Sequence, residues 1–251
     1  MSRYVATDWH GNLRAAQKVL NELMGPEDKL YYLGDCADRG QDGLAVFDLL
    51  TSDPRVTFIK GNHEYFLQEG IERWVKYARP ALSNLWEING GEATAAAVER
   101  SSDEENFKRL AILKKMPYTV TVSVGDKIVI LDHCGYTPKW KEGHNRVKEL
   151  VSADPGWEPM WDRFHFRDAW PEEKDLANVY VVHGHTPTQY LLYRYFAEGV
   201  QDIFPNDKRD FKDEPVIYAD GHKIDLDVVT WYTNKVAVFD LDTMKIITLE
   251  V

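Results

Sequence analysis

The chain has 251 residues, of which 44% are hydrophobic and 28% charged, and its formal net charge is −11. This size and composition are typical of one large soluble domain or two small ones. The negative charge argues against nucleic acid or an anionic membrane as the main partner, although a bound metal could reverse the local field for a small anionic substrate. We find no membrane-spanning run, no signal peptide and only two cysteines, Cys36 and Cys134, and therefore expect a cytoplasmic protein.

Three strand–helix units open the chain. Strands are predicted at 3–7, 30–33 and 56–59, and helices at 13–23 and 43–50. Strands that alternate with helices form parallel sheets, and such sheets bind ligands at the edge where the strands end.

Polar side chains follow each of these strands. They are Asp8 and His10, then Asp35, Asp38 and Arg39, then Asn62, His63 and Glu64. Any one group could be an ordinary polar turn, but three such placements at one sheet edge favour a site. Carboxylate and imidazole groups bind metals, and the fixed fork of an arginine suits phosphate oxygens.

The rest of the chain is predicted to contain one helical insertion and further strands. The insertion, at about 65–115, is broken at Pro80 and at 89–91. The further strands are predicted at 118–124 and 127–131, which form a hairpin, and at 179–182, 216–219, 235–241 and 245–251. The stretches 136–171 and 195–214 lack a regular pattern. Because no linker or repeat interrupts the chain, we expect residues 1–251 to form a single domain.

Six side chains at predicted strand ends offer oxygen or nitrogen ligands and no thiolate. They are Asp8, His10, Asp35, Asn62, His133 and His185. This mixture suits manganese, iron or zinc better than magnesium or calcium. Two such cations that share a carboxylate can bring the pKa of a shared water toward ~7 and offset the charge that builds in an in-line displacement.

In order along the chain, these segments resemble the motifs of the calcineurin-like metallophosphoesterases. The match is strongest to the phosphoprotein phosphatase branch, with its bacterial and bacteriophage lambda-type members. The segments are Asp8-x-His10-Gly11, Gly34-Asp35-x-x-Asp38-Arg39-Gly40, Gly61-Asn62-His63-Glu64, Trp86 with Asn89-Gly90-Gly91-Glu92-x-Thr94, His133, and Gly184-His185-Thr186-Pro187. The resemblance runs from residue 5 to about 240 and implies a four-layer αββα sandwich of two mixed sheets flanked by helices.

The resemblance also implies a dinuclear metal site, with manganese first and iron, zinc, nickel or cobalt as alternatives. Asp8 and His10 would hold the first metal, Asp35 would bridge, and Asn62, His133 and His185 would hold the second. Pro187 replaces the second histidine of the Gly-His-x-His motif found in wider relatives, which favours the phosphoprotein phosphatase branch.

The implied catalytic set comprises a proton donor and phosphate ligands. His63 would be the general acid, oriented by Asp38, and the phosphoryl oxygens would be bound by Arg39, Arg163 and Asn62. Glu64 is expected to make structural hydrogen bonds rather than to bind metal. Cys36 and Cys134 each adjoin an expected ligand, so their oxidation could disturb the site.

The predicted activity is hydrolysis of phosphoserine and phosphothreonine on proteins, extending to phosphotyrosine. The attack would be direct and in-line, by a hydroxide that both metals bind. A dinucleoside polyphosphate hydrolase, acting on diadenosine tetraphosphate, is the alternative enzyme. A regulatory module that binds a phosphorylated ligand or a metal without turnover is the non-enzymatic alternative. The partner would accordingly be a phosphorylated protein or a small phosphoester.

Overall fold

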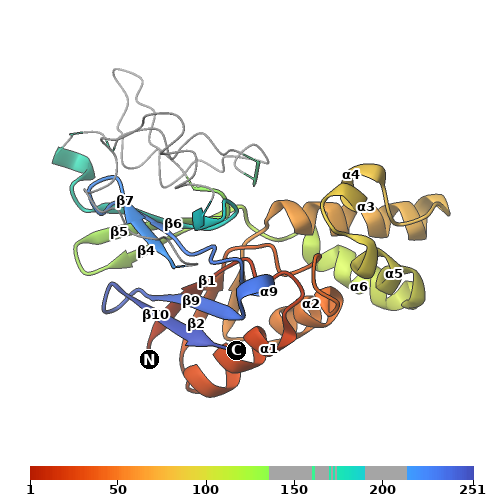
Figure 1. The fold of residues 1–251 in the computed structure, drawn as a ribbon, viewed down its shortest axis with the longest axis horizontal. Helices are drawn as coiled ribbons and strands as arrows, with labels where there is room; N and C mark the ends of the chain where they lie inside the picture. Colours follow the sequence, from red (N-terminus) through yellow and green to blue (C-terminus); the bar gives the residue numbers. More distant parts are fainter. Residues whose placement is uncertain (136–159, 162–169, 171, 173, 190–213) are drawn as a thin grey trace.

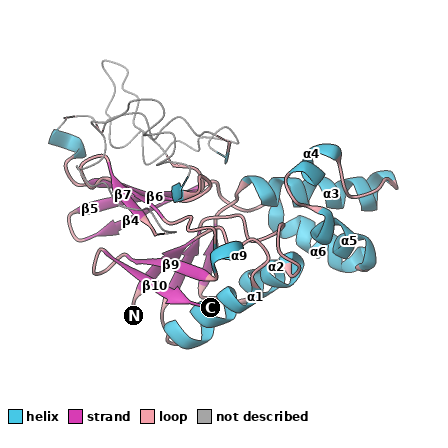
Figure 2. Cartoon of the chain, in the orientation of Figure 1, coloured by secondary structure: helices cyan, strands magenta, loops and turns pink. Residues whose placement is uncertain are grey.

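A computed structural model of the chain describes residues 1–135, 160–161, 170, 172, 174–189 and 214–251. In this part of the chain, two five-stranded sheets face each other, and helices cover the outer face of the first sheet (Figures 1 and 2). Both sheets mix parallel and antiparallel pairs. The predicted fold, two mixed sheets flanked by helices, is confirmed.

The first sheet has the strand order β10-β9-β1-β2-β3. Its strands are β1 (Arg3–Ala6), β2 (Lys29–Tyr32), β3 (Val56–Phe58), β9 (Lys235–Asp240) and β10 (Lys245–Glu250). The three N-terminal strands run parallel, as predicted, while β9 is antiparallel to β1 and β10 to β9. The loops after β1, β2 and β3 therefore emerge at one edge.

The second sheet has the order β4-β5-β6-β8-β7. Its strands are β4 (Thr119–Val124), β5 (Lys127–Asp132), β6 (Val179–His183), β7 (Val216–Tyr218) and β8 (Lys223–Asp225). The predicted hairpin is confirmed as β4 and β5. Strand β8 was not predicted, because Lys223 and Asp225 give its three residues a polar pattern although all three are buried.

Helices flank the first sheet and continue beside it. They are α1 (Leu13–Lys18), extended by a π-helical turn (Val19–Leu23), α2 (Gly43–Ser52), α3 (Asn62–Tyr77), α4 (Asn84–Ile88), α5 (Glu92–Arg100) and α6 (Asp103–Leu113). A short helix, α9 (Thr230–Thr233), precedes β9 and was not predicted. Figure 1 shows α3 to α6 gathered to one side of the sheets. Among the described helices, none has both the length and the apolar character that crossing a membrane requires.

Helix α3 begins at Asn62, three residues before the predicted helical insertion. The Glu64 carboxylate accepts the Gly61 backbone N–H at 2.9 Å and so caps this early start. As a consequence, Asn62 and His63 lie in the first helical turn rather than in a loop. A helical turn gives these two side chains fixed directions.

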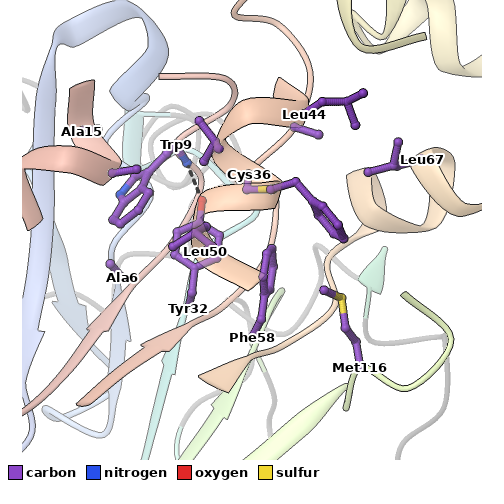
Figure 3. Close-up of a cluster of buried hydrophobic side chains, with 14 of the residues drawn as sticks. Ala6, Trp9, Ala15, Tyr32, Cys36, Leu44, Leu50, Phe58, Leu67 and Met116 are labelled. Carbon is purple, nitrogen blue, oxygen red and sulfur yellow. Dashed lines mark hydrogen bonds between the residues drawn. The ribbon is translucent and has the colours of Figure 1, made fainter. Parts of the chain in front are cut away.

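Two apolar cores hold the layers together. Along β1, Tyr4 and Ala6 face the helices while Val5 faces the second sheet, as strand alternation requires. Figure 3 shows part of the helix-side core, where the Tyr32 ring packs against both Trp9 and Phe58. The Trp9 backbone N–H donates to the Tyr32 hydroxyl at 3.0 Å. The loop after β1 is thus anchored to the neighbouring strand.

Candidate metal centre

The expected ligands lie where strands of both sheets end, and many of them have an unusual backbone. Positive φ angles, between 41° and 71°, occur at Asp8, His10, Asp35, Asp38, Arg39 and His185. This conformation costs a non-glycine residue about 1–2 kcal/mol, so surrounding contacts must hold it. It bends the chain sharply after β1, β2 and β6 and turns the side chains toward one point.

Backbone contacts fasten these loops to one another. The N–H of Asp8 donates to Gly34 O at 3.1 Å, and that of His10 donates to Asp35 O at 3.0 Å. The N–H of His185, from the second sheet, donates to Asp8 Oδ2 at 3.0 Å. A methyl group at Gly184 would overlap this carboxylate. The absence of a side chain there lets the loops of the two sheets meet.

Asp35 lies at the centre of the cluster. Its Oδ1 is 3.2 Å from His133 Nε2, and its Oδ2 is 3.8 Å from both His10 Nε2 and His63 Nε2. Potential ligand atoms form two groups, His10–Asp35–His63 and Asp35–His133–His185, each spanning no more than 4.8 Å. Because Asp35 belongs to both groups, its carboxylate has the position that a bridging ligand requires.

The other expected ligands border the same point. Asp8 Oδ1 lies 3.7 Å from His10 Nε2, and Asn62 Oδ1 lies 2.9 Å from His133 Nε2. His10 Nδ1 is 3.0 Å from Ala37 O, and His133 Nδ1 is 2.8 Å from Leu33 O. Each Nδ1–H can donate to its carbonyl, which leaves Nε2 directed at the cluster, as in metal-binding histidines.

The charge pattern suits divalent cations. Burial, Asp227 and Asp35 together raise the pKa of Asp8 well above its usual range, so a cation there would relieve unfavourable charge. Burial, Arg39 and His63 hold the pKa of His10 well below its usual value, which keeps the imidazole in its neutral, metal-binding form.

The pKa values of Asp35 and His133, at the centre of the cluster, shift in the directions that favour the charged form of each group. Burial opposes the charge on both partners, but His133 and His63 hold the pKa of Asp35 well below its usual range, and Asp35 raises the pKa of His133 to about 10. Within the described part of the chain, the buried Asp8 Oδ1 and His10 Nε2 have no hydrogen-bond partner. The donor set and these two orphaned atoms therefore fit bound divalent metal.

A second feature, the His63–Asp38 pair, stands beside the cluster. His63 Nδ1 lies 2.6 Å from Asp38 Oδ2, and both side chains are buried. The indole N–H of Trp86 donates to the same oxygen at 2.7 Å, and the Asp38 backbone N–H donates to Thr94 Oγ1 at 3.1 Å. This contact was not predicted; its one signal in the sequence was the resemblance of the segment containing Trp86 and Thr94 to the family's motifs.

Arg39 and Glu64 occupy supporting positions at the site. The Arg39 backbone N–H donates to Gly90 O at 2.8 Å, and its charge is close enough to lower the pKa of His10. Glu64 accepts hydrogen bonds from the backbone of Asp35 at 2.8 Å and of Cys36 at 2.9 Å, which confirms its structural role.

Two residues complete the account of the site. Asp227, a buried carboxylate whose charge raises the pKa of Asp8, was missed; it follows the short strand β8, which was also missed. Arg163, expected to bind phosphate, lies outside the described residues.

Comparisons with solved structures find the same fold in several proteins. The structure resembles a candidate diadenosine tetraphosphatase (15% identity, TM-score 0.55, 99% of this chain and 92% of that chain). It also resembles a protein serine/threonine phosphatase from Saccharomyces cerevisiae with similarity to human phosphatase PP5 (13%, 0.57, 100% and 80%). A cold-active protein-tyrosine phosphatase of a psychrophilic Shewanella is similar too (14%, 0.51, 99% and 80%). At these identities the likeness concerns the fold.

A comparison by sequence identifies the family. None of the curated proteins searched matches the chain. The family model described as calcineurin-like phosphoesterase matches residues 1–241, which include the candidate metal centre and the His63–Asp38 pair. The chain therefore belongs to the calcineurin-like phosphoesterase family.

Proposed function

We propose that the chain hydrolyses phosphoserine and phosphothreonine in proteins, with phosphotyrosine as a further substrate. The observation that carries this proposal is the His63–Asp38 pair, at 2.6 Å, beside the cluster centred on Asp35. An alkoxide of serine or threonine is a poor leaving group and needs a proton as the ester bond breaks. A buried histidine with its Nδ1 held by a carboxylate directs Nε2 toward the site, where it can supply that proton.

The cofactors we propose are two divalent cations, with manganese as the first choice. When bound, they would activate a water molecule for in-line attack and offset the negative charge of the phosphoryl group. Asp35 would bridge them, and the remaining ligands would be Asp8, His10, Asn62, His133 and His185. His63, which falls in one ligand group with His10 and Asp35, is assigned to proton transfer because its Nδ1 is committed to Asp38.

The remaining roles concern the phosphoryl group. Arg39 would bind two phosphoryl oxygens through its fork of N–H donors. Its backbone, fixed to Gly90, would keep the guanidinium close to the cluster. The amide of Asn62 would contribute a further polar contact to the substrate. Arg163 is proposed as a second phosphate ligand on the sequence motif alone.

The second candidate function is hydrolysis of a dinucleoside polyphosphate. It is suggested by the structural likeness to a protein described as a diadenosine tetraphosphatase candidate. That reaction expels a nucleotide phosphate, which leaves readily without a proton. The His63–Asp38 pair therefore favours the monoester of an alcohol. A binding module without turnover would have no use for a proton donor.

We propose the cytoplasm as the compartment. Cys36 and Cys134 are buried and are not joined in a disulfide, which fits a reducing environment.

The test is turnover by chelated protein to which Mn²⁺ is added. A phosphoserine peptide, a phosphotyrosine peptide and diadenosine tetraphosphate are compared, with His63→Asn as the control. We expect peptide turnover that the variant loses. Preference for the dinucleotide would support the second candidate, and no turnover with Mn²⁺, Fe²⁺, Zn²⁺, Ni²⁺ or Co²⁺ would contradict both.

A further inference from the structure

We propose that Trp86 is a positioning residue for proton donation, acting on His63 through Asp38. The inference rests on the proposed function, in which His63 protonates the leaving alcohol. The indole N–H of Trp86 and the Nδ1 of His63 meet the same oxygen, Asp38 Oδ2, at 2.7 Å and 2.6 Å. All three side chains are at most 1% exposed, so water does not compete for these hydrogen bonds.

The chemistry of the indole gives this contact a direction. An indole nitrogen can donate a hydrogen bond but cannot accept one. Asp38 Oδ2 must therefore act as an acceptor toward Trp86, and the same oxygen is then presented to His63 Nδ1–H. That arrangement keeps one hydrogen on Nδ1, so the proton that His63 gives to the leaving alcohol is a second one, carried on Nε2 of the imidazolium form; Nε2 faces Asp35, at 3.8 Å from its Oδ2.

The position of the indole is fixed by two close backbone approaches. A methyl group at Gly70, on helix α3, or at Gly91, after helix α4, would overlap the Trp86 ring. Helix α3 also carries His63 in its first turn. Trp86 therefore contacts the helix that bears His63 and hydrogen-bonds the carboxylate that holds it.

The same stretch of chain also supports the Asp38–Arg39 loop. Gly90 O accepts the Arg39 backbone N–H at 2.8 Å, and Thr94 Oγ1 accepts that of Asp38 at 3.1 Å. Both loop residues have positive φ, 71° and 59°. Residues 86–94 thus contact the proton-donating pair and the phosphate-binding arginine at once, without offering a metal ligand themselves.

The test is the Trp86→Phe variant, which keeps a large ring and removes only the N–H donor and part of the ring. We expect kcat for a phosphoserine peptide to fall about 10-fold, as for other residues that orient a functional side chain. For p-nitrophenyl phosphate, whose leaving group needs no proton, the fall in kcat should be much smaller. KM for both esters should change little, because phosphate binding does not involve the indole.

Two controls separate positioning from simple structural support. Trp74→Phe changes a half-buried tryptophan of α3 that packs on the same core, and it should affect both esters alike and slightly. In the Asp38→Asn background, Trp86→Phe should add almost nothing to the loss of kcat, since residues that act through one another are not additive. Equal losses for both esters, or full additivity with Asp38→Asn, would overturn the inference.

A measurement without turnover covers the case in which Trp86→Phe does not fold. The ¹⁵N–¹H signal of the Trp86 indole, assigned in the wild-type protein, should exchange slowly with solvent and should shift in Asp38→Asn. An indole signal whose chemical shift is the same in Asp38→Asn as in the wild type would overturn the inference. An inactive wild type, or a fully active His63→Asn, would refute the proposed function, whereas a His63 effect without any Trp86 effect would refute the inference alone.

Discussion

The metal cluster and the His63–Asp38 pair are neighbours, yet they are built in different ways. The cluster draws its side chains from loops of both sheets, bent by positive φ angles and joined across the gap by the His185 N–H on Asp8. The His63–Asp38 pair depends on the first turn of helix α3, which carries His63, and on the indole of Trp86, which lies 48 residues from Asp38 in the chain. We therefore expect that metal binding and proton donation, as proposed, can be lost separately by changes in different parts of the fold.

The largest expected effect comes from Asp35→Asn, which removes the carboxylate common to both ligand groups. We expect activity on a phosphoserine peptide to fall ~10³-fold. The substitution leaves one oxygen ligand where the carboxylate has two, and it removes the negative charge that would hold both cations. Bound metal should fall with it, as measured by elemental analysis of the dialysed protein. Asp126→Asn, at the exposed β4–β5 turn, is the matched control and should leave both unchanged. Undiminished metal content in Asp35→Asn would contradict the bridging role.

His63→Asn should separate the two regions. With a phosphoserine peptide, kcat should fall ~10²-fold because the leaving alkoxide loses its proton donor. Metal content should stay at the wild-type ratio, again measured by elemental analysis. A variant that loses one metal per chain would instead make His63 a ligand, a role that its distance to Asp35 Oδ2, 3.8 Å, leaves geometrically open.

Removing the metal at different pH values tests the proposed metal site itself. In the metal-free protein, the pKa of Asp8 is raised by burial and nearby carboxylates and that of His133 is raised to about 10, so folding favours the protonated form of both groups. The stability that these protons contribute is complete below the unfolded pKa values and is lost as the pH rises through the folded ones. Metal replaces the protons, so its stabilising effect should increase with pH.

The measurement is the melting temperature with and without Mn²⁺ at several pH values. At a free metal concentration of 100 Kd, the gain should be about 2.7 kcal/mol for each cation site. Asp35→Asn should abolish most of this gain. A stabilisation by Mn²⁺ that decreases as the pH rises would contradict the protonation scheme.

The smallest expected effect concerns the cysteine next to Asp35. Burial and the nearby carboxylates of Glu64, Asp38 and Asp35 raise the pKa of the Cys36 thiol well above its usual value, so the reactive thiolate is scarce. We expect no alkylation of Cys36 in the native protein by mass spectrometry, and full alkylation after unfolding. Rapid native alkylation of Cys36, or peroxide inactivation that thiol reverses and Cys36→Ser prevents, would revive a redox role.

The candidate ligands could be selected from the sequence because they follow local patterns. Asp8, Asp35 and Asn62 each follow a short apolar run, and a strand followed by a polar turn can be recognised within a few residues. The early start of α3 was less accessible, since it depends on one capping contact from Glu64. The single-domain organisation of the chain stays a prediction.

The features that were missed depend on partners distant in the chain. Strand β8 is a buried Lys-Ile-Asp run whose strand character comes from pairing with β6 and β7. Val229, beyond it, has a φ of 57°, which a β-branched residue rarely adopts and no local signal foretells. The contact of Trp86 with Asp38 is equally invisible locally, because an apolar aromatic residue in a helix is ordinarily core.

The central claim is that two cations lie on either side of Asp35, between the loops of the two sheets. Anomalous diffraction at the manganese edge, from crystals grown with Mn²⁺, tests it most directly. The account predicts two peaks about 3.5–4 Å apart that share the Asp35 carboxylate, with Nε2 of His10 on one and of His133 on the other, and with His63 bound to neither. A single peak, or a peak coordinated by His63 in place of His10, would contradict it.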